Sequence, residues 1–248
     1  MCMPKIIGVI PARFASSRLP GKVLADIGGK PLIQHTYENA LQSKFLEEIL
    51  VAVDDPRVEE AVLAFGGTPI MTDPALPSGS DRVAATVRDM DCDIVVNIQG
   101  DEPFLPVHIV DQAIQLLLDD PELPIGTVCR EIFTEEELND PGVVKVALAP
   151  DGRGLYFSRS IIPYPRNNKD FHAYEHIGVY VFRKDFLLQY VEWEPTPLER
   201  AESLEMLRIL EHGYPIKVAV TASEDYGFSI DTPDDLEKAR EYYAEKHQ

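Results

Sequence analysis

The segment IIGVIPARFASSRLPGKVL, from Ile6 to Leu24, places an apolar run directly before a basic loop. Apart from one glycine, the first five residues are β-branched, which is typical of a strand buried on both faces. The loop holds three cations, Arg13, Arg18 and Lys22, among proline, glycine and serine. A buried strand that ends in such a loop is typical of the ligand-binding edge of an α/β sheet.

Outward from this segment, strands and helices alternate through the first half of the chain. Apolar runs predict further strands over 48–54, 68–72 and 93–99. Apolar residues on one helical face predict helices over 31–41, 57–65 and 80–90. Repetition of strand and helix predicts a mostly parallel central sheet with right-handed crossovers and helices on both faces.

The second half is less regular. Turn residues between apolar runs predict a hairpin of 143–148 and 155–158. Further elements are predicted by the same patterns: strands over 176–182 and 216–220, and helices over 184–191 and 197–212. A last helix begins near Thr232, which suits an N-cap with Asp235 as its capping-box acid. We predict one domain over 1–248, with a smaller elaborated part at about 143–190.

The charge of the chain limits its partners. Asp and Glu number 42 against 23 Lys and Arg, which gives a net charge of -19. Such a surface repels nucleic acid and anionic membranes, so we expect neither as a partner. The cysteines, Cys2, Cys92 and Cys129, are too scattered for a disulfide framework or a CxxC metal pair. With no apolar run near the ~18 residues of a membrane span, we expect a cytoplasmic protein.

Several familiar motifs are absent or incomplete. The basic loop is not a P-loop, because Ser16 stands at the first glycine position and Val23 where Ser or Thr is required. No GxGxxG fingerprint occurs. HAYEH, at 172–176, matches the H-x-x-E-H of one class of zinc protease. That chemistry needs both histidines on one helix face, whereas His176 leads directly into the predicted strand.

The basic loop suits a polyphosphate. Backbone amides in turns bind phosphate oxygens, and Arg and Lys neutralise their charge. Mg²⁺ bound with phosphates takes one or two carboxylates, and Asp101 and Asp231 follow predicted extended runs at the same sheet edge. The alternatives are that Asp101 serves a tight turn in GDEP and that Asp231 stabilises the last helix. The apolar strand before Asp101 favours the metal role.

The whole chain resembles the CMP-Kdo synthetases, the 3-deoxy-manno-octulosonate cytidylyltransferases of lipopolysaccharide biosynthesis. Long motifs in the same order carry this resemblance: IPARFASSRLPGKVL (10–24), GGKPLIQHTYENA (28–40), MTDPALPSGSDR (71–82), VNIQGDEP (96–103), VKVALAPDGRGLYFSRSIIPY (144–164), HIGVYVFRKDFL (176–187), LEMLRILEHG (204–213) and DTPDDLEKAR (231–240). The resemblance implies a Rossmann-like nucleotidyltransferase fold, a homodimer, CTP as donor, a 3-deoxy-ulosonic acid as acceptor and Mg²⁺ as cofactor. The elaborated part at about 143–190 is expected to bind the acceptor sugar and to form the dimer.

The resemblance also implies roles for particular residues. Those implied to bind the nucleotide are Ala12, Arg13, Arg18, Lys22, Ser78, Gly79, Arg82 and Gln99. Asp101 and Asp231 are implied to hold Mg²⁺, and Arg13, Lys22 and Asp101 are the expected catalytic residues. Those implied to face the sugar acid are Arg159, His176, Tyr180 and Glu205. For these, the alternatives are a surface ion pair at Arg159, a satisfied histidine at the start of a strand, and core packing of Tyr180.

One departure from the family bears on the acceptor. The family motif LEQLR reads LEMLR here, with Met206 in place of glutamine. If that glutamine contacts the sugar, its loss changes substrate preference. The leading hypothesis is a cytidylyltransferase that makes CMP-Kdo. The alternatives are an enzyme for an amino-substituted Kdo or another nonulosonic acid, and a non-catalytic nucleotide-binding subunit, against which intact Lys22, Asp101 and Asp231 argue.

Overall fold

The computed structural model describes residues 4–16, 18–167, 171–223 and 225–246. The chain forms two compact units, Met1–Asp111 with Asp225–Gln248, and Gln112–Glu224. The predicted elaboration at 143–190 lies within the second unit, and the single domain over 1–248 stays a prediction. Cys2 lies outside the described residues.

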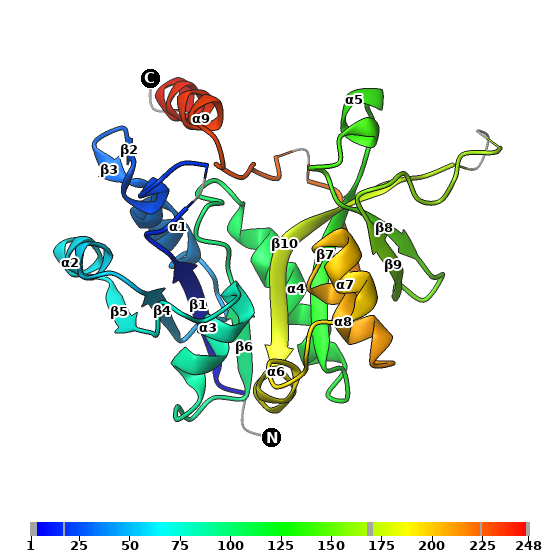
Figure 1. The fold of residues 1–248 in the computed structure, drawn as a ribbon, viewed down its shortest axis with the longest axis horizontal. Coiled ribbons are helices and arrows are strands. Elements are labelled where there is room, and N and C mark those ends of the chain that lie inside the picture. Colours follow the sequence, from blue (N-terminus) through cyan, green and yellow to red (C-terminus); the bar gives the residue numbers. More distant parts are fainter. Residues whose placement is uncertain (1–3, 17, 168–170, 224, 247–248) are drawn as a thin grey trace. The chain divides into compact units, whose positions relative to one another are not determined.

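A parallel sheet forms the centre of the first unit (Figure 1). Its strands are β1 (Ile6–Ala12), β4 (Glu48–Val53), β5 (Thr68–Met71) and β6 (Ile94–Asn97), and β1 pairs in parallel with both β4 and β6. β5 extends the sheet beyond β4. Ile7, Val9 and Ile10 have no exposed surface, so the predicted buried strand is confirmed. Because these strands are parallel, the loops after β1, β4 and β6 leave the same edge.

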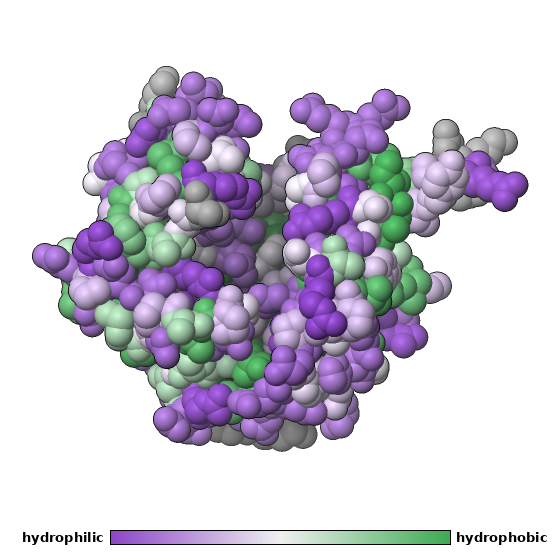
Figure 2. Space-filling view, in the orientation of Figure 1, coloured by the Kyte–Doolittle hydropathy of each residue, from purple (hydrophilic) through white to green (hydrophobic). Residues whose placement is uncertain are grey.

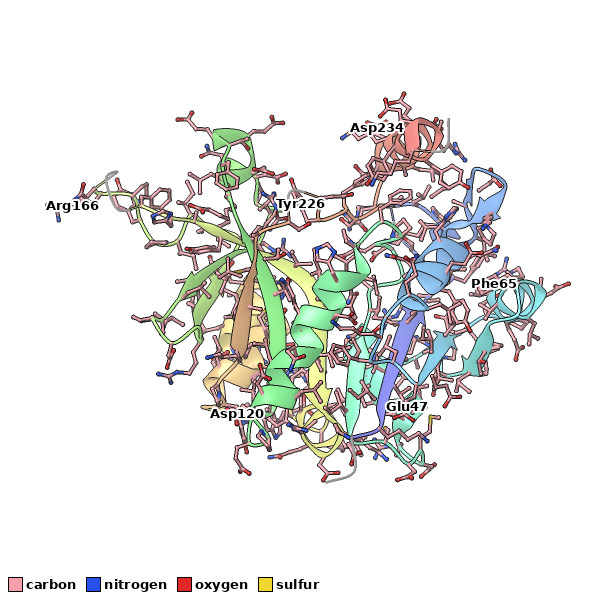
Figure 3. The ribbon with its side chains drawn as sticks, turned by 180° about the vertical axis from the view of Figure 1, so that it is seen from behind. Glu47, Phe65, Asp120, Arg166, Tyr226 and Asp234 are labelled. Atoms are coloured by element: carbon pink, nitrogen blue, oxygen red, sulfur yellow. The ribbon has the colours of Figure 1, made fainter. Side chains whose placement is uncertain are left out.

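Helices pack on this sheet as the apolar spacing predicts. They are α1 (Leu32–Ala40), α2 (Pro56–Ala64) and α3 (Gly79–Val87), and α1 and α3 cover opposite faces (Figures 1 and 3). Asp55 and Ser78 cap α2 and α3 by accepting from backbone N–H groups. A 3-10 helix, η1 (Lys22–Leu24), ends the basic loop, and a two-stranded hairpin follows it, β2 (Asp26–Ile27) and β3 (Lys30–Pro31).

The chain returns to the first unit for its last helix, α9 (Pro233–Lys246). The Asp235 carboxylate accepts from the Thr232 N–H at 3.0 Å, and the Thr232 hydroxyl accepts from the Asp235 N–H at 3.2 Å. The predicted capping box is therefore confirmed. Ile230, Leu236 and Ala239 pack against Ile27 and Leu32, which holds α9 beside the β2–β3 hairpin (Figure 1).

The second unit has strands in both directions. β10 (Tyr174–Arg183) pairs antiparallel with β7 (Ile125–Glu131) and with β8 (Lys145–Leu148), while β11 (Lys217–Thr221) runs parallel to β7. β8 forms the predicted hairpin with β9 (Gly154–Ser158). The helices of this unit are α5 (Glu135–Asn139), α6 (Lys184–Tyr190), α7 (Pro197–Glu202) and α8 (Met206–Glu211), and α4 (Val107–Asp119) spans the division between the units.

The single helix predicted over 197–212 is wrong. α7 ends at Ser203, whose φ of 54° lies in the left-handed region, and α8 begins at Met206. A non-glycine residue in that conformation interrupts the α-helical hydrogen-bond pattern. The sequence also led to no predicted helix over 107–119 and no predicted strand over 125–131, where the structure has α4 and β7.

Hydrophilic residues dominate the face shown in Figure 2, with hydrophobic ones in small groups. Glu47, Asp120 and Arg166 point away from the ribbon in Figure 3. No helix in the described part of the chain is both long and apolar enough to cross a membrane.

Candidate active site

The basic loop begins at the carboxyl end of β1, and two hydrogen bonds of the Phe14 backbone hold its ends in place. We call these contacts the neck of the loop. The Gly21 N–H donates to the Phe14 carbonyl oxygen at 3.0 Å, and Gly21 takes a φ of 69°, which favours glycine. The Phe14 N–H in turn donates to Asp54 Oδ1 at 2.9 Å. The neck therefore fixes both ends of the loop and holds Lys22 at the sheet edge.

A cavity of about 330 Å³ lies against this loop. Its walls come from four places: the basic loop, the start of α3, the segment after β6 and the segment before α9. Its lining residues are Pro11, Arg13, Ala15, Ser16, Arg18, Lys22, Val23, Gly79, Gln99, Gly100, Asp101 and Asp231. The three cations outnumber the two carboxylates, so this cavity is net positive within a chain of net charge -19.

Lys22 lies at the centre of an ionic cluster in the cavity. Its Nζ donates to Asp101 Oδ2 at 2.6 Å and to Asp231 Oδ1 at 2.8 Å. Arg18 Nη2 lies 2.9 Å from the same oxygen of Asp231. Burial opposes the charge on Lys22, but Asp101 and Asp231 together outweigh burial and raise the pKa of its ammonium above the usual value. Lys22 is therefore a cation at neutral pH.

Asp231 lies close to Asp101, but the segment that places it there differs from the extended run that the sequence predicted. Residues 225–231 form no strand, so the extended run expected before Asp231 is wrong. Instead, the Ile230 N–H donates to the Asp101 carbonyl oxygen at 2.9 Å, and the Ile230 side chain is fully buried. Burial of one apolar side chain thus places the neighbouring carboxylate in the site.

Gly100 allows the segment after β6 to approach β1 closely. A Cβ atom at this position would lie 2.5 Å from the Pro11 carbonyl oxygen, a backbone atom that cannot move aside. Only glycine fits there without a shift of the chain. The glycine therefore sets the position of Asp101 relative to the basic loop.

The two carboxylates fit the donor set of Mg²⁺. Asp101 and Asp231 already share one cation, the Lys22 ammonium, which shows that their oxygens converge. Among the described residues no group of three or more His, Cys, Asp and Glu side chains could hold a metal ion. A two-carboxylate set completed by phosphate oxygens and water is the usual way that Mg²⁺ binds with nucleotides.

The other predicted nucleotide residues divide into two groups. Arg13 and Gln99 line the cavity, and Arg13 Nη2 donates to the Leu76 carbonyl oxygen at 2.6 Å. Gly79 lines it at the start of α3. Three do not line it: Ala12 and Arg82 are fully buried, and Ser78 caps α3. Their nucleotide contacts stay predictions.

The predicted sugar residues all lie in the second unit. The Arg159 Nε donates to the Glu202 carbonyl oxygen at 2.8 Å, and its Nη1 donates to the Pro141 carbonyl oxygen at 2.9 Å. The Glu202 carboxylate accepts from the Arg159 N–H at 2.9 Å. Among the described residues no carboxylate forms an ion pair with this guanidinium, which leaves its charge available for an anion.

His176 is a buried histidine with a protein partner. It is 8% exposed, its Nε2 lies 3.0 Å from Thr127 Oγ1, and Phe157 meets its ring edge to face. Its ring also lies 5.2 Å from that of half-buried Tyr180. Burial lowers the pKa of His176 to about 3. The ring is therefore neutral at physiological pH, and a sugar contact would have to use Nδ1.

This burial predicts a pH dependence of stability. The unfolded imidazole takes a proton below about pH 6.5, but the folded one does so only near pH 3. Protonation therefore favours the unfolded state, and the contribution of His176 is lost as pH falls between these values. In His176→Gln we expect the free energy of unfolding to fall less steeply between about pH 7 and about pH 4. Urea unfolding at several pH values measures both slopes, and equal slopes would contradict a neutral buried His176.

The H-x-x-E-H match does not have the geometry of a zinc protease. Residues 174–183 form β10, so His176 lies on a strand rather than on the helix that the motif requires. His172 Nδ1 lies 2.5 Å from Glu131 Oε1, whereas the His176 Nε2 lies against Thr127. The interpretation as the start of a strand is the one that the structure supports.

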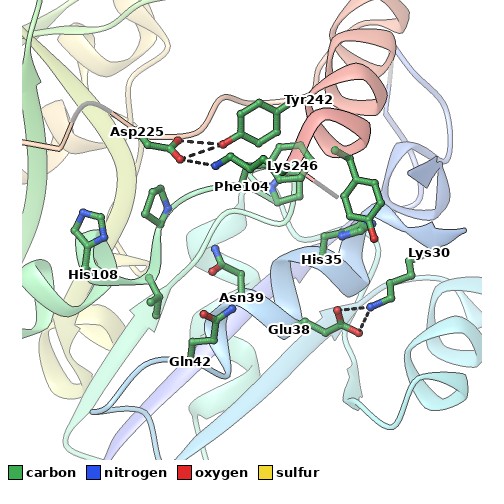
Figure 4. Close-up of a pocket in the computed structure, with 14 residues that line it drawn as sticks. Lys30, His35, Glu38, Asn39, Gln42, Phe104, His108, Asp225, Tyr242 and Lys246 are labelled. Atoms are coloured by element: carbon green, nitrogen blue, oxygen red, sulfur yellow. Dashed lines mark hydrogen bonds and ion pairs between the residues drawn. The ribbon is translucent and has the colours of Figure 1, made fainter. Parts of the chain in front are cut away.

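A larger cavity of about 500 Å³ lies elsewhere in the first unit (Figure 4). Lys30 in its wall is paired with Glu38 at 2.7 Å, and Lys246 with Asp225 at 2.7 Å. Its two lysines are thus matched by two carboxylates, and Phe104 and Tyr242 add aromatic surface. Because its charges cancel, it suits a triphosphate less well than the smaller cavity at Lys22.

Comparison with known proteins shows the family of the chain. The chain matches the model of the cytidylyltransferase family over residues 7–224. It is 45% identical over 248 residues to the 3-deoxy-manno-octulosonate cytidylyltransferase of Geotalea uraniireducens, with 96% of this chain and 98% of that protein covered. It is 46% identical over 244 residues to the Escherichia coli enzyme of the same name, with 98% of each covered. The chain belongs to the 3-deoxy-manno-octulosonate cytidylyltransferase family.

The fold of this cytidylyltransferase agrees with that of a solved relative. The structure of a CMP:2-keto-3-deoxy-manno-octonic acid synthetase complexed with CTP matches it with a TM-score of 0.94 at 46% identity, covering 98% of this chain and 99% of that one. The predicted α/β nucleotidyltransferase fold is thereby confirmed.

Asp54 is a residue of this cytidylyltransferase site that the sequence reading missed. It follows β4 and is 7% exposed at its side chain. One carboxylate oxygen accepts from the Phe14 N–H at the neck of the basic loop, and the other lies 3.4 Å from Nη2 of fully buried Arg82. An acid at the carboxyl end of a predicted strand was the available signal.

We expect Asp54→Asn to destabilise the enzyme and weaken nucleotide binding together. The variant leaves the buried Arg82 guanidinium without its countercharge, so the free energy of unfolding should fall by about 3 kcal/mol. The adjacent Asp55→Asn is the matched control, because Asp55 pairs with exposed Arg57 and asparagine can still cap α2. Urea unfolding and KM for the nucleotide measure both effects, and equal effects of the two variants would contradict this role of Asp54.

Proposed function

We propose that this protein joins CTP and 3-deoxy-manno-octulosonate (Kdo) to give CMP-Kdo and pyrophosphate, and so activates Kdo for lipopolysaccharide biosynthesis. The observation that carries the proposal is the cluster of Lys22, Asp101 and Asp231 in a net-positive cavity, in a chain of this family. A protein that only bound a nucleotide would not need two converging carboxylates beside a lysine. This argues against a non-catalytic subunit.

The nucleotide is held through its phosphates. Arg13, Arg18 and Lys22 neutralise the triphosphate, and Gly79, at the start of α3, lines the same cavity. The contacts expected from Ala12, Ser78 and Arg82 to the cytidine stay predictions. Asp101 and Asp231 would hold Mg²⁺, which supplies charge neutralisation at the phosphates when bound.

In the reaction, the anomeric hydroxyl oxygen of Kdo forms a bond to the α-phosphorus of CTP. The bond from that phosphorus to the bridging oxygen of pyrophosphate breaks, pyrophosphate leaves with the bond electrons, and the hydroxyl loses its proton. Negative charge grows on the leaving and non-bridging oxygens, and the Lys22 ammonium, held in the cavity by Asp101 and Asp231, is a point charge that stabilises it. Positioning by the protein supplies much of the remainder.

The acceptor is held by residues of the second unit. Arg159 offers a planar fork to the carboxylate of the sugar acid. Tyr180 and Glu205 offer a hydroxyl and a carboxylate for sugar hydroxyls, and the Tyr190 hydroxyl lies 3.4 Å from Glu205 Oε2. The neutral ring of His176 would contact the sugar through Nδ1.

A related acid is the second candidate acceptor. Met206, which replaces the glutamine of the family motif, is 4% exposed and offers no amide to a polar ligand. A panel of Kdo, an amino-substituted Kdo and a nonulosonic acid decides between them, with the CMP ester detected by mass spectrometry. We expect the Kdo ester with CTP and none with UTP or ATP. If only another acid gave a CMP ester, that acid and not Kdo would be the acceptor.

The assembly and location stay predictions. Two exposed apolar residues, Leu155 at 61% and Tyr164 at 82%, lie in or beside the segment expected to form a homodimer, which supports that expectation. The cytoplasmic location rests on composition and on the need for CTP.

A further inference from the structure

Lys145 is a fully buried lysine outside the set of residues that the proposed reaction uses. It lies at the start of β8 opposite Ser158 of β9, and none of its surface is exposed. Its Nζ donates to the carbonyl oxygens of Asp140 at 2.6 Å, Val143 at 2.9 Å and Arg159 at 3.1 Å. All three N–H donors of the ammonium are thus used in hydrogen bonds to backbone carbonyl oxygens.

An ammonium is costly to bury, so its position needs a reason. A methionine or leucine would fill the same space without the desolvation penalty. What the ammonium adds is a rigid link between the 140–143 turn and the peptide of Arg159. The Arg159 side chain grips the same turn, because its Nη1 donates to the Pro141 carbonyl oxygen at 2.9 Å. Lys145 and Arg159 are therefore both hydrogen-bonded to the 140–143 turn.

The electrostatics point the same way. Burial and the nearby charge of Arg159 lower the pKa of Lys145 below its usual value, and the charges of Asp140 and Glu175 oppose that change. Asp140 and Glu175 affect the pKa of Lys145 more than Arg159 does. The effect of Arg159 still shows that the two cations lie close enough to interact.

We propose that Lys145 is a positioning residue for the acceptor: it holds the Arg159 guanidinium in the orientation that binds the sugar carboxylate. This inference rests on the proposed function, in which Arg159 contacts that carboxylate. Lys145 does not touch the substrate. Its removal should therefore affect the acceptor and spare the nucleotide.

The test is Lys145→Met in the full chain, with KM measured for each substrate. We expect KM for Kdo to rise roughly 10-fold or more and KM for CTP to stay within about 2-fold. The matched control is Lys217→Met, which removes another lysine of the second unit that donates to a backbone carbonyl, that of Asp151, and should change neither KM. Lys145→Gln, whose amide keeps two N–H donors, should lie between the wild type and Lys145→Met.

The same change made in an Arg159→Gln protein tests this inference separately from the proposed function. Arg159→Gln alone should raise KM for Kdo, and adding Lys145→Met to it should raise KM by no more than about 2-fold, because both changes act through one group. If Arg159→Gln leaves KM for Kdo unchanged, the assigned sugar site is wrong. If it raises KM but Lys145→Met does not, only the role of Lys145 is wrong. Failure of both Lys145 variants to fold, or equal loss for CTP and Kdo, also overturns the proposal.

Discussion

Replacement of Lys22 by methionine is expected to lower the turnover number by ~10²-fold or more. The ammonium is held between two carboxylates, Asp101 and Asp231, at 2.6 and 2.8 Å, in the cavity that we propose binds the triphosphate. Methionine keeps the length of the side chain but removes the charge that stabilises the leaving oxygens. KM for CTP should rise less than the turnover number falls, because the stabilisation belongs mainly to the transition state.

The matched control for this change is Lys30→Met. Lys30 also pairs with a carboxylate in the first unit, that of Glu38 at 2.7 Å, but it lies outside the cavity of Lys22. Its variant should keep normal turnover. Steady-state rates of pyrophosphate release measure both variants, and similar rates for Lys22→Met and the wild type at saturating CTP and Mg²⁺ would contradict the assignment.

Asp101→Asn is expected to have the largest effect, a loss of turnover on the order of 10³-fold. The amide keeps the size of the side chain and much of the hydrogen bonding to Lys22, so the fold should survive. It removes one of the two anionic oxygen donors that suit Mg²⁺, and the Mg²⁺ concentration for half-maximal rate should rise.

The control for Asp101→Asn is Asp225→Asn. Asp225 also accepts from a lysine in the first unit, Lys246 at 2.7 Å, and should tolerate the change. Thermal unfolding of each variant checks that the fold is intact. A folded Asp101→Asn protein with near-normal turnover and an unchanged Mg²⁺ requirement would remove Asp101 from the catalytic site.

The first half of the fold could be predicted because its signals are local. β1 is a run of β-branched residues with almost no exposed surface, and α1, α2 and α3 carry apolar residues at helical spacing. α4 carried the same signal in Ile109, Ala113 and Leu117, all buried, but it was left unassigned. β7 was missed too, although its pairing with β10 and β11 buries most of its residues.

The site was only partly predictable because some of its contacts are made by the tertiary structure. Motifs identified Lys22, Asp101 and Asp231, but the bond that brings Asp231 to Asp101 comes from a segment without regular structure. Asp54 acts through the backbone of Phe14 and through Arg82. Lys145 reads in the sequence as an ordinary polar residue of a strand. No local pattern reports that its ammonium is enclosed by the carbonyl groups of Asp140, Val143 and Arg159.

The most direct test of the account is the release of pyrophosphate from CTP in the presence of Mg²⁺, with and without Kdo. We expect release only when CTP and Kdo are both present, and none when UTP or ATP replaces CTP. Release from CTP without any sugar acid, or no release with any acid from a folded protein, would contradict it.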